Sequence, residues 1–260
     1  MANPFALNLN NEINSRFSVD AVNMSYSDWV CKNTTLKSAP FNFKRFPFQK
    51  AIVDDLHPNL HVIKISQVGL TETQIRKAAA FCARNRGVTV LMTFPTEAMM
   101  KKNSQTRIMP IIETDRVFNL TGGKPIRSID IQQIGDSYLM VVPATEGSAT
   151  STPADFIMVD EIDLSNQQMV GLLGSRLQAS SYRIMQQFST PTFENYGIHQ
   201  GYMTTDQREY FLKCDCCNHW QLPLFTKDFI HIDGLPDKIE LADIDTNVID
   251  TYGLKLNNVG

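Results

Sequence analysis

Lys64, Gly69 and Thr71 lie within the short segment KISQVGLT (64–71), between an expected strand and an expected helix. The amide groups and the dipole of a helix N-terminus attract anions, so this segment is a candidate phosphate-binding loop. It departs from the usual G-x-x-x-x-G-K-[ST] pattern, because Lys64 replaces the first glycine and Leu70 replaces the lysine. An ordinary strand-to-helix turn capped by a hydroxyl side chain is the alternative interpretation.

Two adjacent carboxylates, Asp160 and Glu161, end the apolar segment FIMVDE (156–161). A nucleotide hydrolase needs one carboxylate for the Mg²⁺ shell and a second to polarise the attacking water. The carboxyl ends of parallel strands form the ligand-binding edge of a sheet, which is where these acids are expected. The alternative is a strand end that carries two solvated acids.

Two further segments contain polar residues that suit a nucleotide. Gln49 follows Phe48 in FKRFPFQK (43–50), and its amide matches the Hoogsteen edge of adenine, while a ring could stack on the base. A proline-broken hydrophobic segment before a helix is the alternative. In FSTPT (188–192), small hydroxyl residues at a strand end could sense a γ-phosphate or form a turn.

Short apolar runs alternate with amphipathic segments along the middle of the chain. The expected strands are 60–65, 88–94, 137–143, 156–161 and 183–189, and the expected helices are 71–86, part of 96–113, and 164–177. This alternation predicts an α/β fold with a mainly parallel sheet flanked by helices. We expect a flexible N-terminal arm at 1–25, a core at 26–200, and a small subdomain at 201–260 with a thiol hairpin and an acidic tail.

Composition excludes several classes of protein. With 43% hydrophobic and 20% charged residues, the chain is neither a disordered tail nor a collagen-like rod. No membrane span or secretory signal is evident, and the clustered cysteines favour a reducing compartment, so we expect a cytosolic protein. The net charge of −3 divides into an excess of basic residues over 1–110 and of acidic residues over 111–260. A basic half suits a nucleotide or DNA, although a solvated basic face explains it equally well.

Taken together, these segments resemble a known family. FPFQKAIVDD, KISQVGLTE, FIMVDEID, FSTPT and the hairpin that begins at YFLKC are similar to the ATPase half of large terminase subunits of tailed bacteriophages. These motors pump DNA into procapsids, and the closest likeness is to their lambda-type branch. The resemblance covers roughly residues 26 to 225. It implies a RecA-like fold of the ASCE P-loop NTPase class, with ATP and Mg²⁺ as cofactors.

The resemblance also implies a role for each matching residue. In the lambda-type branch a lysine often occupies the first loop position, so Lys64 would carry the phosphate-binding charge. Glu161 and Lys64 would be catalytic. Adenine would be bound by Phe48 and Gln49, and the phosphates by Ser66, Gln67, Val68, Gly69 and Leu70. Thr71 and Asp160 would hold Mg²⁺, and Ser189 and Thr190 would couple hydrolysis to movement.

Partners and location follow from the same resemblance. It implies double-stranded viral DNA, the portal protein and the small terminase subunit as partners, a homo-oligomeric ring, and no membrane. The motor would work in the host cytoplasm, docked on the procapsid. A non-hydrolysing adaptor with a decayed phosphate loop and a helicase-like translocase remain alternatives. Relatives often carry an arginine before the two acids, whereas 144–156 has none, and Arg107, Arg116, Arg127 and Arg183 are unranked substitutes.

A thiol cluster follows the core. Cys214 and Cys217 form a C-x-x-C pair, and thiolates at this spacing can bind Zn²⁺ when two more ligands are present. His219 or His231 would help to complete such a site. The alternative is a set of reduced, partly buried thiols.

Overall fold

The computed structural model describes residues 23–119, 124–145, 147, 152–222, 234–236 and 251. The chain divides into two compact units, Met1–Gln207 and Arg208–Gly260. The first unit continues past residue 200 because helix α10 (Gly197–Tyr202) packs against strand β3 (Asn59–Ile63). The arm expected at 1–25 and most of the expected acidic tail lie outside the described residues.

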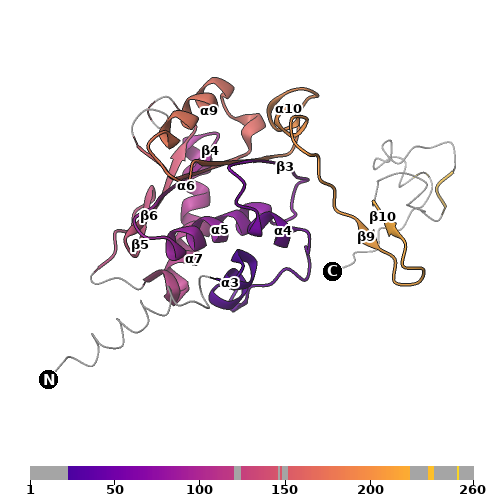
Figure 1. Cartoon of the computed structure of the whole chain (residues 1–260), viewed down its shortest axis with the longest axis horizontal. Coiled ribbons are helices and arrows are strands. Elements are labelled where there is room, and N and C mark those ends of the chain that lie inside the picture. The colour runs from indigo at the N-terminus through magenta and orange to yellow at the C-terminus, as the bar shows by residue number, and fades with distance from the viewer. Residues whose placement is uncertain are drawn as a thin grey trace. The chain divides into compact units, whose positions relative to one another are not determined.

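A six-stranded sheet forms the centre of the first unit (Figure 1). Its order is β3, β8 (Ile184–Ser189), β7 (Phe156–Asp160), β4 (Thr89–Phe94), β6 (Ser137–Pro143) and β5 (Ile131–Ile134). All neighbouring pairs are parallel except β5 and β6. The prediction of a mainly parallel α/β sheet is therefore confirmed, and each of the five expected strands is present.

Both faces of the sheet are covered by helices, which explains the unbroken apolar runs in β4 and β7. On one face, Met92 and Met158 belong to the core cluster that includes residues of α5 (Leu70–Arg84). On the other face, Leu91 and Ile157 pack with residues of α9 (Gln167–Leu173) and α10. Successive strand residues alternate between these two cores, as the two-residue period of a strand requires.

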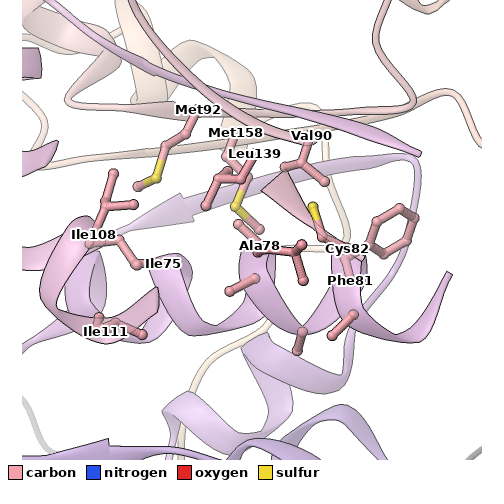
Figure 2. Close-up of a cluster of buried hydrophobic side chains, with 14 of the residues drawn as sticks. Ile75, Ala78, Phe81, Cys82, Val90, Met92, Ile108, Ile111, Leu139 and Met158 are labelled. Carbon is pink, nitrogen blue, oxygen red and sulfur yellow. The ribbon is translucent and has the colours of Figure 1, made fainter. Parts of the chain in front are cut away.

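Helix α5 is the central buried helix. It begins after Gly69, and its alanines allow the helix backbone to lie close to the sheet. Figure 2 shows Ile75, Ala78 and Cys82 of this helix beneath side chains from the strands. The strand side chains labelled there are Val90, Met92, Leu139 and Met158. Because α5 is packed tightly in this way, its first turn is a rigid support for the candidate phosphate-binding loop (64–71).

The remaining helices are short. They are α3 (Tyr26–Asn33), α4 (Gln49–Asp54), α6 (Glu97–Asn103), a π-helix (Ser104–Ile108), α7 (Met109–Thr114) and 3₁₀ turns at Arg116–Asn119, Ile162–Leu164 and Gly174–Leu177. The helix expected at 164–177 is thus broken into α9 and its two flanking turns. Asn166 causes the first break, because its side chain accepts hydrogen bonds from the backbone N–H groups of Gln168 and Met169 and caps α9.

Apart from the six-stranded sheet, the described residues form two short antiparallel hairpins. Strands β1 (Thr35–Leu36) and β2 (Ala39–Pro40) pair in the first unit, and β9 (Leu212–Lys213) and β10 (Trp220–Gln221) pair in the second. The second pair is the hairpin expected around the thiols. Among the described residues, no helix has both the length and the apolar character needed to cross a membrane.

Candidate nucleotide-binding and hydrolysis site

Three strand ends meet at the carboxyl edge of the sheet. Strand β8 lies between β3 and β7, so that Ile63 pairs with Ser189, and Asp160 pairs with Phe188. The backbone N–H of Lys64 donates to the carbonyl of Ser189 at 2.9 Å. The start of the candidate phosphate-binding loop, the hydroxyl segment and the acidic pair therefore lie side by side, as their sequence positions predict.

Lys64 bridges both acids. Its Nζ lies 2.6 Å from Oδ1 of Asp160 and 2.9 Å from Oε1 of Glu161. The Lys64 and Asp160 side chains are 7% and 2% exposed, whereas the Glu161 side chain is 27% exposed. Burial disfavours the charge of Lys64, but the attraction and hydrogen bonds of the two carboxylates outweigh it and raise the pKa of the ammonium. The ammonium is therefore charged at neutral pH.

Thr71 and Asp160 form the part of the site that suits Mg²⁺. The Thr71 hydroxyl, in the first turn of α5, donates to Oδ2 of Asp160 at 2.8 Å and lies 3.5 Å from Nζ of Lys64. Hydroxyl and carboxylate oxygens are the ligands that Mg²⁺ prefers, and the ion usually keeps several waters beside them. The donor set therefore fits a Mg²⁺ ion that also binds the phosphates of a nucleotide.

Glu161 has an unusual backbone conformation. Its φ of 53° and ψ of 51° are left-handed, although it carries a side chain. Its N–H donates to Oδ1 of Asp160 at 3.2 Å, and the Ser189 hydroxyl donates to its Oε2 at 3.5 Å. This turn brings the second carboxylate back over the strand ends. Such strain at a non-glycine residue is typical of functional sites.

The candidate phosphate-binding loop leads from β3 into α5. Gln67 and Gly69 have positive φ angles of 64° and 71°, which curve the backbone ahead of the helix. Ser66, Gln67 and Gly69 are exposed, whereas Leu70 is only 2% exposed. The side chain of Leu70 packs into the interior, so only its backbone can face a phosphate. The buried position explains why an apolar residue is accepted where the usual pattern has lysine.

Gln49 supports this loop from the first turn of α4. Its Nε2 donates to the carbonyl of Val68 at 2.5 Å, and its Oε1 accepts from the Thr73 hydroxyl at 2.6 Å. The residue is 3% exposed. Phe48 is half-buried, with its ring 6.1 Å from that of Phe46. Both ends of the Gln49 amide thus bond within the protein, which differs from the expectation that this amide faces adenine.

Sequence reasoning missed two residues that hold the site. Thr73 fixes the Gln49 amide, and Asp163 accepts hydrogen bonds from Thr192 and Ile198. Asp163 is the last residue of FIMVDEID, and no pattern in that segment marks it as a contact of Thr192 or Ile198. Thr190 is half-buried beside Ser189, whose hydroxyl donates to its carbonyl at 3.1 Å.

Two of the candidate arginines donate hydrogen bonds to nearby backbone carbonyls. Arg127 donates to the carbonyls of Ile126 and Phe118, and Arg183 donates to those of Ser180 and Gln178. Their guanidinium groups are therefore engaged in local structure.

The thiol hairpin forms no metal-ligand group. Backbone hydrogen bonds from Cys217 and Cys216 lower the pKa of the Cys214 thiol. Within the part of the chain that the structure describes, no three His, Cys, Asp or Glu side chains are grouped so that they could hold a metal ion. The expected zinc set of Cys214, Cys217 and His219 is thus not supported among the described residues. His231 lies outside the described residues.

The fold is a mainly parallel α/β sheet with the candidate site at its carboxyl edge. The structure is similar to the crystal structure of the HK97 bacteriophage large terminase, with a TM-score of 0.53 and 8% identity over 67% of this chain and 39% of that chain. A large terminase from a thermophilic bacteriophage matches with a TM-score of 0.43 and 14% identity, over 64% of this chain and 39% of that one. The chain thus spans about two fifths of these terminases.

A family profile described as "Phage terminase large subunit gpA, ATPase domain" matches residues 36–244. The chain therefore belongs to this family and is an ATPase domain. No curated protein sequence matches it. The resemblance inferred from the five sequence segments is confirmed.

Proposed function

We propose that this chain hydrolyses ATP with Mg²⁺ and that hydrolysis moves double-stranded DNA into a viral procapsid. The observation that carries the proposal is the cluster of Lys64, Thr71, Asp160 and Glu161 at the carboxyl edge of a RecA-like sheet. Membership of the terminase ATPase family supports the assignment to DNA packaging. The chain's own side chains support the assignment of ATP hydrolysis.

Lys64 would exchange its two carboxylate partners for oxygens of the β- and γ-phosphates. Thr71 and Asp160 would hold the metal, and the loop from Ser66 to Gly69 would turn its backbone N–H groups toward the phosphates. When bound, Mg²⁺ neutralises charge that develops on the phosphate oxygens. Lys64, Thr71 and Asp160 each lie at a strand end or in the first turn of α5, so these side chains are positioned in advance.

Glu161 would orient and polarise the attacking water, since its carboxylate is more exposed than that of Asp160. Ser189 touches Glu161 and shares a backbone hydrogen bond with Lys64, so it contacts both halves of the site. We assign it, with Thr190, the role of linking hydrolysis to movement. Release of Lys64 from Glu161 on phosphate binding would free that carboxylate to accept a proton from water.

We further propose that the motor works as a homo-oligomeric ring in the host cytoplasm, docked on the procapsid beside the portal protein and the small terminase subunit. DNA contacts would come from surface lysines and arginines. Such contacts release counterions, so binding should fall steeply as the salt concentration rises.

Titration with a non-hydrolysable ATP analogue tests the proposal first, with Mg²⁺ present and with Mg²⁺ removed by chelation. We expect binding that depends on the metal. Single-turnover hydrolysis with excess protein then separates a motor from a non-hydrolysing adaptor. Metal-dependent binding without any hydrolysis would favour the adaptor, and no binding at all would contradict the nucleotide site.

A further inference from the structure

One carboxylate, that of Asp163, holds both ends of the segment 192–198. Its Oδ2 accepts hydrogen bonds from the backbone N–H and the hydroxyl of Thr192, at 2.8 and 3.0 Å. Its Oδ1 accepts from the backbone N–H of Ile198 at 2.8 Å. Asp163 is 7% exposed, and hydrogen bonds to an ionised, buried acceptor are among the stronger ones in proteins. The two ends of the segment are therefore fixed to one point.

Gly197 gives independent evidence that this contact is close. Its φ is +51°, and a Cβ atom built on it would lie 2.4 Å from Oδ1 of Asp163. No side chain fits at that distance, so the segment can approach the carboxylate only with glycine at this position.

Asp163 also belongs to the turn that carries the catalytic carboxylate. Its backbone N–H donates to the Ser189 hydroxyl at 3.3 Å, and the same hydroxyl lies 3.5 Å from Oε2 of Glu161. Between the two fixed ends, the rings of Phe193 and Tyr196 are 73% and 37% exposed, with centroids 6.3 Å apart. A movement of the Glu161 turn would therefore be passed to two exposed aromatic side chains.

We propose that Asp163 is a positioning residue that fixes the segment 192–198 to the Glu161 turn. Nucleotide binding at the site would then change the positions of the Phe193 and Tyr196 side chains. The proposal rests on the proposed function, since it assumes that Glu161 acts on bound nucleotide. Asp163 itself needs no contact with the nucleotide. Its effect should appear in the rate of hydrolysis and in the response of the segment, and not in nucleotide affinity.

Asp163→Asn tests this, because asparagine keeps the shape but presents an NH₂ group to one of the backbone N–H donors. A Phe193→Trp reporter, combined with Trp220→Phe, follows the segment by acrylamide quenching, while Trp29 is buried and shielded. In the reporter protein, we expect Mg²⁺ with a non-hydrolysable ATP analogue to change the quenching. With Asp163→Asn added, this change should be lost. Single-turnover hydrolysis should fall about 10²-fold, as small displacements of catalytic groups do, with unchanged affinity.

Asp115→Asn is the matched control. Asp115 is 4% exposed and accepts hydrogen bonds from the N–H and hydroxyl of Thr35, so its chemistry is the same. The control should lose thermal stability but keep the reporter response and the rate. If Asp163→Asn behaves like this control, or loses affinity as much as rate, the proposal is overturned. A reporter protein with native Asp163 that binds no nucleotide would instead overturn the proposed function.

Discussion

Nζ of Lys64 lies 2.6 Å from Oδ1 of Asp160, although 96 positions separate the two residues in the sequence. Lys64 directly follows strand β3 and Asp160 ends strand β7, and strand β8 lies between these two strands. The ion pair offsets the charge of a carboxylate that would otherwise be buried without an opposite charge beside it. In the proposed mechanism, nucleotide binding would replace this pair with a pair between Lys64 and phosphate, and with a contact between Asp160 and the metal.

Lys64→Met should weaken binding of the Mg²⁺–ATP analogue about ten- to a hundredfold, the usual effect of removing one hydrogen bond to a charged group. Isothermal titration calorimetry measures this directly. Lys50→Met is the matched control, because Lys50 pairs with Asp28 at 3.2 Å on the exposed surface. Exposed pairs contribute little, so this control should bind like the wild type. Equal affinities for both variants would show that Lys64 does not bind phosphate.

Glu161→Gln should leave binding of Mg²⁺–ATP intact and lower single-turnover hydrolysis by about 10²–10⁴-fold, because one positioned catalytic group is removed. Asp160→Asn should in addition reduce the dependence of binding on Mg²⁺, measured with and without chelator. The two acids differ in exposure and in contacts with Thr71, so they should not be interchangeable. Identical phenotypes for the two variants would contradict the separate roles.

Gln49→Ala distinguishes support of the loop from recognition of adenine. Because the amide bonds to Val68 and Thr73, its loss should weaken ATP and GTP binding by the same factor. Thr73→Val should give the same pattern, and the double variant should be less than additive. A loss confined to ATP would instead show that Gln49 leaves these partners to bind adenine.

The protonation of Lys77 should make the stability of the fold depend on pH. It is buried in α5 and donates to the carbonyls of Ile52 and Asp55 and to Oε1 of Gln186. Burial lowers the pKa of this lysine to about 7. Between about pH 7 and its ordinary value, the unfolded chain then binds the proton that the folded chain lacks, so stability rises with pH in this window.

Relative to Lys77→Met, which cannot titrate, the free energy of unfolding of the wild type should therefore increase from pH 7 to 10. The increase is at most about 1.4 kcal/mol per pH unit. Denaturant unfolding at several pH values measures it. Parallel pH profiles for the two proteins would mean that the three acceptors keep Lys77 charged.

The sequence predicts the sheet and the position of the candidate site at its carboxyl edge because both depend on local patterns. The apolar run from Phe156 to Val159 and the two acids after it are consecutive in the sequence, so the pattern can be recognised within one short segment. Contacts made by residues far apart are not visible in that way. Nothing near Gln49 in the sequence indicates that Val68 and Thr73 would take both ends of its amide.

Strand β5 was not predicted for a related reason. The segment from Ile131 to Ile134 is short, and its two glutamines hide the alternation of buried and exposed positions. Its antiparallel pairing with β6 follows from the turn at Gly135, where φ is 61°. The polar residues of this segment favour a loop when the segment is considered alone, whereas pairing with β6 makes it a strand.

At position 161, the left-handed backbone favours residues that stabilise the fold, whereas the proposed activity requires glutamate. A residue with a long side chain is costly there, whereas glycine and asparagine adopt this conformation more easily. In a library varied only at position 161, selection for resistance to heat should enrich glycine and asparagine. Selection for ATP turnover should retain glutamate. The backbone of this turn thus makes the chain pay in folding free energy for a carboxylate placed beside Lys64 and Ser189.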